Sequence, residues 1–169
     1  MAVIVVMGVS GSGKTTVGGL LAAQLGWAYA EADSFHPRTN IDKMAAGTPL
    51  DDTDRTPWLR AIATWIGAHA AGGGVVSSSA LAHRYRDILR TGGPVWFLHL
   101  HGTPELIATR MAARPGHFMP TSLLDSQFAA LEPLSGAEAG LVAEVTESAE
   151  RIVDAAVRAY ESWSRGIEA

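Results

Sequence analysis

Residues 8–15 have the sequence Gly-Val-Ser-Gly-Ser-Gly-Lys-Thr, which matches the phosphate-binding loop pattern G-x-x-x-x-G-K-[ST]. An unbroken apolar run at 3–7 precedes the loop and predicts a strand that is buried on both faces of a parallel sheet. The segment 15–25 is rich in helix formers and is followed by Gly26, a typical residue after a helix end. A strand, a glycine-rich loop and a helix in this order favour a true phosphate-binding loop over a chance glycine-rich turn.

This loop predicts a binding site for the phosphates of a nucleoside triphosphate. Its three glycines let the backbone wrap closely around an anion, and N–H groups at the start of the helix point toward that anion. We expect the Lys14 ammonium to reach the β- and γ-phosphates, and the Thr15 hydroxyl to ligate Mg²⁺. The expected nucleotide-binding residues are Gly8, Val9, Ser10, Gly11, Ser12, Gly13, Lys14, Thr15 and Thr16.

The composition describes a compact chain with one core. The 169 residues are 47% hydrophobic and 18% charged, which predicts a single domain spanning 1–169. The net charge of −4 argues against a nucleic-acid surface, and the absence of cysteine fits a reducing cytoplasm. The apolar run at the N-terminus is too short to span a bilayer and lacks the basic residues of a signal peptide, so no membrane association is expected.

Strands and helices alternate along the rest of the chain. Together with the first strand, this alternation predicts an α/β fold with a five-stranded parallel sheet and helices on both faces, and it leaves the strand order open. The further strands are expected at 27–30, 75–79, 95–100 and 141–145. The further helices are expected at 41–46, 57–69, 80–89, from 103 onward, at 122–131 and after Ser148.

Two acidic residues follow the second predicted strand. Ligands of open α/β sheets bind at the carboxyl ends of the strands, and residues two apart on an extended segment project to the same side. Glu31 and Asp33 meet both conditions, whereas the third strand ends in serines and offers no acid. We expect one carboxylate to lie near the metal, and the other to orient an acceptor hydroxyl and take its proton.

A loop at 115–120, with one glycine and two prolines between helices, predicts a mobile lid that extends over about 115–133. Arg110 and Arg114 precede this loop four residues apart, so on one helix they would share a face. They are candidates for stabilising a transferring phosphoryl group, and a solvated stripe of charge is the alternative.

Arginine and histidine near the expected site indicate an anionic or strongly polar acceptor. The candidates are His36, Arg55 and Arg86, although each could equally be a surface residue. His99 and His101 would lie on one side of a strand, but no third ligand follows at a zinc-like spacing, so no zinc site is expected.

Taken together, these motifs resemble the small P-loop gluconate kinases (gluconokinases), which are relatives of shikimate kinase and the nucleoside monophosphate kinases. The resemblance spans nearly the whole chain. It rests on the loop at 8–15, Asp33-Ser-Phe-His-Pro37, Asn40-Ile-Asp-Lys-Met44, Pro49-Leu-Asp-Asp52, Asp54-Arg55, Pro57-Trp-Leu59, Ser79-Ala-Leu81, Tyr85-Arg-Asp87, Arg114-x-Gly-His-Phe118, Gln127-Phe128 and Leu131-Glu-Pro133.

The resemblance implies a three-layer P-loop NTPase fold with a lid. It also implies ATP- and Mg²⁺-dependent phosphorylation of D-gluconate at its 6-hydroxyl, a cytoplasmic setting and a homodimer. By resemblance the catalytic residues are Lys14, Asp33, Arg110 and Arg114, and the metal-site residues are Thr15 and Glu31. The acceptor-site residues implied in the same way are Asp33, His36, Arg55, Ser79, Arg86 and His117.

The sequence departs from this family at two places. Ala82 and His83 stand where family members usually carry two lysines, and Glu31 replaces the first acid of an Asp-x-Asp pair. The first departure keeps open a kinase of another small polar acceptor, such as shikimate or a related sugar acid. A nucleotide-binding regulator without transfer activity is a further alternative. A GTPase is not expected, because the sequence has no Asn-Lys-x-Asp motif.

Overall fold

A five-stranded parallel sheet forms the centre of the computed structural model, which describes residues 1–115 and 121–168. The strand order is β2-β3-β1-β4-β5, and every neighbouring pair is parallel, so the predicted sheet is confirmed. The strands are β1 (Val3–Met7), β2 (Ala28–Glu31), β3 (Gly74–Ser77), β4 (Val95–His101) and β5 (Gly140–Glu144). The helices are α1 (Lys14–Leu25), α2 (Arg38–Ala45), α3 (Asp52–His69), α4 (His83–Arg90), α5 (Pro104–Ala112), α6 (Thr121–Ala130) and α7 (Ala149–Glu168).

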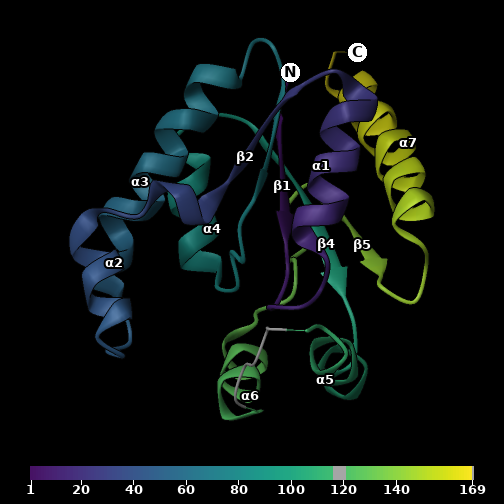
Figure 1. The fold of residues 1–169 in the computed structure, drawn as a ribbon. Helices are drawn as coiled ribbons and strands as arrows, with labels where there is room; N and C mark the ends of the chain where they lie inside the picture. The colour runs from purple at the N-terminus through teal and green to yellow at the C-terminus, as the bar shows by residue number, and fades with distance from the viewer. Residues whose placement is uncertain (116–120, 169) are drawn as a thin grey trace.

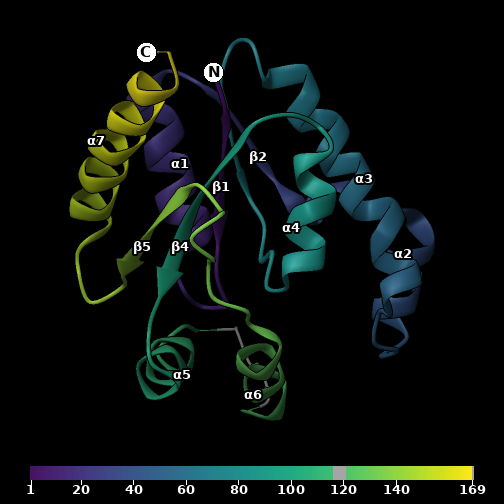
Figure 2. The same cartoon turned by 180° about the vertical axis from the view of Figure 1, so that it is seen from behind.

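Helices cover both faces of the sheet and complete three layers (Figure 1). One face packs against α1 and α7, and the opposite face packs against α3 and α4, as the view from behind also shows (Figure 2). The central strand β1 serves both cores, because successive side chains of a strand point to opposite faces. Ile4 and Val6 lie in the first core, and Val3, Val5 and Met7 lie in the second. The unbroken apolar run is therefore what a strand with two covered faces requires.

The segments that follow the strands meet at one edge of the sheet. β1 leads into the phosphate loop, β2 into a single 3-10 turn at Ala32–Phe35, and β3 into the segment 78–82. Beyond this edge lie α5 and α6, below the arrowheads of the strands in Figure 1. A ligand held by several of these loops must therefore bind at the carboxyl edge of the sheet.

Two helix starts differ from the sequence prediction. α3 begins at Asp52 and not at Pro57, because Asp51 forms a capping box: its carboxylate accepts the Asp54 N–H at 2.8 Å, and the Asp54 carboxylate accepts the Asp51 N–H at 3.0 Å. α4 begins at His83 and not at Ala80, because Ala80 has a φ of +44°, outside the right-handed helical region.

The final helix α7 matches its predicted amphipathic pattern. Ser148 caps it by accepting the Arg151 N–H at 3.3 Å, and Ile152, Ala156 and Tyr160 lie on its buried side. Its opposite face is charged. Within 1–115 and 121–168, no helix combines the length and apolar character that crossing a membrane would require.

Candidate active site

A cleft of about 840 Å³ opens at the carboxyl edge of the sheet. Its walls come from the phosphate loop, the ends of β2 and β3, the region from α2 to α3, and the helices α5 and α6. Most of the residues predicted for the site line this one cleft. They are Ser10, Gly11, Gly13, Lys14, Thr15, Thr16, Glu31, Asp33, His36, Arg55, Ser79 and Arg114.

The phosphate loop takes its shape from two glycines. A Cβ on Gly8 would lie 2.8 Å from both the Leu100 carbonyl oxygen and the Ser12 hydroxyl, so a side chain does not fit there. Gly13 caps α1 in the left-handed conformation, with φ of 93°, and lets the helix begin at Lys14. Gly8, Val9 and Ser12, which were predicted to contact nucleotide, do not line the cleft; Val9 and Ser12 are buried beneath the loop.

Lys14 lines the cleft from the phosphate loop. Its Nζ donates a hydrogen bond to the Val9 carbonyl at 3.0 Å, which holds the ammonium against the loop. Burial lowers the pKa of Lys14 to about 8, although the nearby carboxylates of Asp33 and Glu31 favour the charged form. The lysine is therefore a cation at neutral pH that loses its proton in mildly alkaline solution, and bound phosphates would favour its charged form further.

Glu31 is fixed at the end of β2 by its neighbours. The Tyr29 hydroxyl donates to the Glu31 carboxylate and lies 2.9 Å from the Ser77 hydroxyl, which can donate to the Lys14 carbonyl at 2.9 Å. Burial, together with the bond to Glu31, raises the pKa of Tyr29 to about 12, so the phenol remains a neutral donor. This chain of bonds ties the first acid of the pair to the start of α1.

The cleft offers the donor set of a magnesium site. The Thr15 hydroxyl and the carboxylates of Glu31 and Asp33 line it together, and all three supply the oxygen ligands that Mg²⁺ prefers. Over the described residues, no group of three or more His, Cys, Asp or Glu side chains is arranged to hold a metal ion.

Across the cleft from the phosphate loop, His36 packs flat on Trp58. Their ring centroids are 4.4 Å apart with an interplanar angle of 12°, and Trp58 Nε1 donates to the Ala32 carbonyl at 2.7 Å. Burial lowers the pKa of His36, so its imidazole is neutral at pH 7. Trp58 belongs to the core between the sheet and α3 and also forms part of the wall of the cleft.

Arg55 presents a positive charge at the same wall. Its guanidinium lies 3.2 Å from Asp52 Oδ1 and 3.4 Å from the Tyr85 hydroxyl, and 34% of its side chain is exposed. Arg84 also binds Asp52, at 2.9 Å, from outside the cleft. Asp52 thus orients Arg55 while leaving it accessible to an anionic ligand.

Arg86 corrects the sequence prediction, because it does not contact the cleft. The side chain is fully buried, and its Nε donates to Glu138 Oε2 at 2.6 Å. α4 begins three residues later than predicted, at His83, and packs the Arg86 position against the interior. The side of a helix that faces the core depends on where the helix begins, which the sequence pattern misjudged here.

Arg110 is a second correction. Its guanidinium donates to the Val145 carbonyl, and the side chain does not line the cleft, whereas Arg114 does. The shared face predicted for the two arginines requires a continuous helix, but α5 ends at Ala112. The chain has left the helix at Arg114, so the spacing of four no longer aligns the side chains. The predicted acceptor residue His117 lies outside the described residues.

The two positions where lysines were expected lie behind the cleft. Ala82 is buried, and His83 Nδ1 lies 2.9 Å from Glu138 Oε1. Neither residue lines the cleft, so any contact that a lysine at these positions would make with a ligand is missing here.

Gln127 is a cleft residue that sequence reasoning left without a role. From α6, its Oε1 accepts the Ser10 N–H at 2.7 Å, and its Nε2 donates to the Ser10 hydroxyl at 3.0 Å. The one sequence signal for it is its place in the stretch Gln127-Phe128 that resembles the gluconate kinases.

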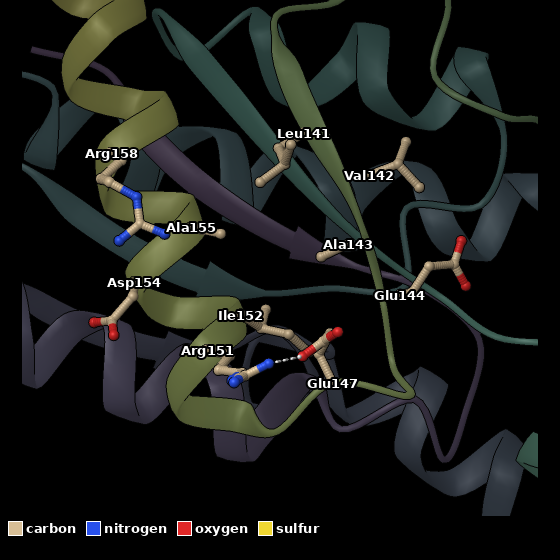
Figure 3. A pocket seen from close by; sticks show the side chains of 10 residues that line it. All are labelled: Leu141, Val142, Ala143, Glu144, Glu147, Arg151, Ile152, Asp154, Ala155 and Arg158. Atoms are coloured by element: carbon tan, nitrogen blue, oxygen red, sulfur yellow. Dashed lines mark hydrogen bonds and ion pairs between the residues drawn. The ribbon is translucent and has the colours of Figure 1, made fainter.

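A second hollow, of about 390 Å³, lies between the edge strand β5 and α7 (Figure 3). Its lining includes Leu141, Glu144 and Asp154, and Glu147 pairs with Arg151 across it at 3.3 Å. It contains no residue of the phosphate loop or of the acidic pair, so the chemistry is placed in the larger cleft.

A phosphate loop with its lysine, and two carboxylates at the carboxyl edge of a parallel sheet, place the chain in the class of P-loop nucleotide-binding proteins. The family model described as shikimate kinase matches residues 10–159. The chain is 50% identical to the thermosensitive gluconokinase of Escherichia coli over 131 residues (76% of this chain and 70% of the relative), and 44% identical to a probable gluconokinase of Xenopus tropicalis, with 89% of each covered. A crystal structure of a gluconokinase from Sinorhizobium meliloti superposes with a TM-score of 0.89 at 41% identity, covering 99% of this chain and 95% of that one.

The chain therefore belongs to the gluconokinase family. Membership of a kinase family implies ATP as the phosphoryl donor.

Proposed function

We propose that this protein transfers the γ-phosphoryl group of ATP to the 6-hydroxyl of D-gluconate and releases ADP and 6-phospho-D-gluconate. The observation that carries the proposal is the single cleft in which the phosphate loop and Lys14 lie beside Asp33, with His36 and Arg55 on the same wall. The relatives named gluconokinase support the choice of acceptor.

In the proposed reaction, N–H groups of the phosphate loop and the Lys14 ammonium hold the β- and γ-phosphates. Asp33 accepts the proton of the acceptor hydroxyl as its oxygen forms a bond to the γ-phosphorus, while the bond between that phosphorus and the oxygen of ADP breaks. Such a transfer depends mainly on positioning and on stabilising charge, which a fixed lysine and carboxylate provide.

Thr15 and Glu31 are the residues that would hold Mg²⁺, with Asp33 beside them. When bound, Mg²⁺ neutralises charge on the phosphate oxygens during transfer. The bond from Tyr29 keeps the Glu31 carboxylate oriented toward the cleft.

The guanidinium of Arg55 is suited to the carboxylate of gluconate, because a planar cation can bind a carboxylate through two parallel hydrogen bonds. Asn40 Nδ2 lies 3.3 Å from His36 Nδ1 and can only donate to it, so the neutral ring of His36 would offer its Nε2–H to a sugar hydroxyl. Ser79 would add a further contact from the end of β3.

We further propose that the lid, predicted at about 115–133, closes over the bound substrates, carrying His117 toward the acceptor and Arg114 toward the transferring phosphoryl group. Arg110 is assigned a different task. It bonds the Val145 carbonyl in the segment 144–148, which we propose as the place of the adenine contacts.

Residues 1–169 are proposed to act as one kinase domain in the cytoplasm. A homodimer, and the absence of nucleic-acid and membrane partners, are also proposed, from the family resemblance and from the charge and composition. Light scattering on the purified protein would test the dimer, and a mass equal to one chain would contradict it.

The deciding experiment is ADP release by the purified protein with Mg²⁺-ATP, measured with D-gluconate, with shikimate, with a related sugar acid and with no acceptor. We expect strong release only with D-gluconate. Release that favours another acceptor would assign the site to that substrate, and no acceptor-dependent release would contradict a kinase function for this cleft.

A further inference from the structure

Arg86 makes an unusual number of bonds for a side chain outside the cleft. Its Nη1 donates to the Ala80 carbonyl at 2.7 Å and to the Leu81 carbonyl at 3.2 Å. Its Nη2 donates to the Glu132 carbonyl at 3.0 Å and lies 3.4 Å from the Pro133 carbonyl. One guanidinium therefore binds the backbone of two segments that lie about fifty residues apart in the sequence.

Glu138 provides the compensating charge. Its carboxylate lies 2.6 Å from Arg86 Nε and 3.2 Å from Nη2, and only 3% of its side chain is exposed. Burial opposes ionisation of this carboxyl, but the Arg86 guanidinium and the Ser135 N–H outweigh burial and lower the pKa of Glu138 to about 2. The pair is thus ionic throughout the neutral range. Removing Glu138 would leave the buried Arg86 charge without its carboxylate partner, whereas removing Arg86 would leave Glu138 with Arg90, whose Nη1 lies 3.5 Å away.

The first segment that Arg86 holds follows β3 and contributes to the cleft. Ser79 lines the cleft, and its carbonyl accepts the Gly8 N–H at 3.2 Å. Ala80 has a φ of +44°, a conformation that is uncommon for a residue with a side chain and that must be maintained by surrounding bonds. The bond from Arg86 to the Ala80 carbonyl is one of these restraints.

The second segment follows α6. The Glu132 N–H donates to the Leu81 carbonyl at 2.8 Å, and the Glu132 carboxylate accepts the His83 N–H at 2.7 Å. These bonds and those of Arg86 fix the carboxyl end of α6 against the start of α4. Three residues before the end of the same helix, Gln127 makes its two bonds to Ser10 in the phosphate loop.

We propose that Arg86, paired with Glu138, is a positioning residue: it locks the segment after β3 to the end of α6, and thereby places Gln127 against the phosphate loop. Arg86 touches neither substrate and acts on nucleotide binding through Gln127, and on the acceptor through Ser79. The effect on the acceptor (the acceptor arm of the proposal) rests on the proposed function, whereas the effect on nucleotide binding (the nucleotide arm) does not.

A double-mutant cycle on Mg²⁺-ATP affinity, measured by titration calorimetry without acceptor, tests the nucleotide arm. Gln127→Ala and Arg86→Lys should each weaken binding about three- to tenfold, as expected for lost hydrogen bonds at one loop. If Arg86 acts through Gln127, the double variant should bind Mg²⁺-ATP about as tightly as whichever single variant binds it more weakly. If the double variant instead loses Mg²⁺-ATP affinity by the product of the two single losses, the proposal is overturned.

Tyr160→Phe is the control for a general loss of stability. The Tyr160 hydroxyl is buried and bonds the N–H and carbonyl of Ala2, both at 3.0 Å, far from the cleft. This variant should lower the free energy of unfolding without changing ATP affinity. An ATP affinity that tracks unfolding free energy across all variants would reduce Arg86 to a structural role and overturn the proposal.

If Arg86→Lys does not fold, Glu138→Gln takes its place in the cycle, because it keeps the shape of the pair while removing the negative charge. In the acceptor assay, Arg86→Lys should raise the KM for D-gluconate more than Gln127→Ala does; equal effects would overturn the acceptor arm. A wild-type protein that ignores D-gluconate would contradict the proposed function, and the ATP cycle would still decide the role of Arg86.

Discussion

The two sides of the cleft are built in different ways. The nucleotide side comes from one continuous segment, residues 8–16, whose backbone N–H groups and single lysine follow directly from a buried strand. The side proposed for the acceptor is assembled from side chains far apart in the sequence, such as His36, Arg55 and Ser79, which line the cleft. The first side depends on local backbone geometry, and the second depends on packing between α3, α4 and the sheet.

The charged side chains of the two sides, Lys14 and Arg55, also differ in their surroundings. Burial shifts the pKa of Lys14, so its charge is sensitive to its surroundings. Arg55 is held by Asp52 in a partly exposed ion pair, an arrangement that contributes little to stability. Substitution of Lys14 should therefore appear in kcat, whereas substitution of Arg55 should appear mainly in the KM of the acceptor.

Asp33 lies where the two sides meet, and its substitution should have the largest effect. Asp33→Asn should lower kcat by about a hundredfold to ten-thousandfold, the range for a lost general base, while Mg²⁺-ATP still binds. Asp42→Asn, at an exposed carboxylate paired with Arg38, is the matched control and should keep normal turnover. Lost ATP affinity with normal turnover at saturation would remove Asp33 from the acceptor role.

Lys14→Ala should lower kcat by about a hundredfold or more, because it removes a fixed charge directed at the transferring phosphoryl group. Lys43→Ala is the natural control, since Lys43 is the one other lysine of the sequence and binds Asp54 at 2.6 Å outside the cleft. Steady-state kinetics at saturating ATP measure both variants. Near-normal turnover of Lys14→Ala would refute its assignment.

Substitutions of Arg114 and Arg110 should affect different kinetic constants, although the two residues lie only four positions apart. Arg114→Ala should reduce kcat by about tenfold to a hundredfold, as for a lost charge-stabilising donor, with a smaller change in acceptor affinity. Arg110→Ala should instead raise the KM for ATP, because Arg110 bonds Val145 beside the expected adenine segment. A change confined to the gluconate KM in Arg114→Ala would move that arginine to the acceptor side.

The smallest effect concerns pH. In the enzyme without bound nucleotide the pKa of Lys14 is about 8, so its charged form is present below that pH and is lost above it. The kcat/KM for ATP should fall to half near pH 8 and then decrease about tenfold per pH unit, since this ratio reports ionisations of the free enzyme. Lys14→Arg, whose guanidinium stays charged, should lack this break at any residual rate. A wild-type profile that is flat to pH 9.5 would contradict the assignment.

Several features were correctly predicted because they are local. The phosphate loop needs particular residues in one short stretch, and the core strand needs an apolar run, so both leave a direct trace in the sequence. The adjacent carboxylates Glu31 and Asp33 were found in the same way, from their place after a strand. The five-stranded parallel sheet followed from the alternation of elements, although its order did not.

The errors concern side chains whose direction depends on where a helix begins and ends. Arg86 was expected at the acceptor and is buried against Glu138, because α4 starts three residues later than its pattern indicated. Arg110 was expected beside Arg114, but α5 ends between them. A shift of one or two residues at a helix end rotates a side chain away from its expected neighbour, and nothing in the local pattern fixes such an end.

The sequence by itself determined that this chain holds phosphates at the end of a buried strand, since that requirement is met by contiguous residues. Only the tertiary structure decided which arginines reach the cleft, that Trp58 shares its wall, and that Gln127 joins α6 to the phosphate loop. These features depend on contacts between distant segments, and such contacts form only once the sheet order and the helix ends bring the segments together.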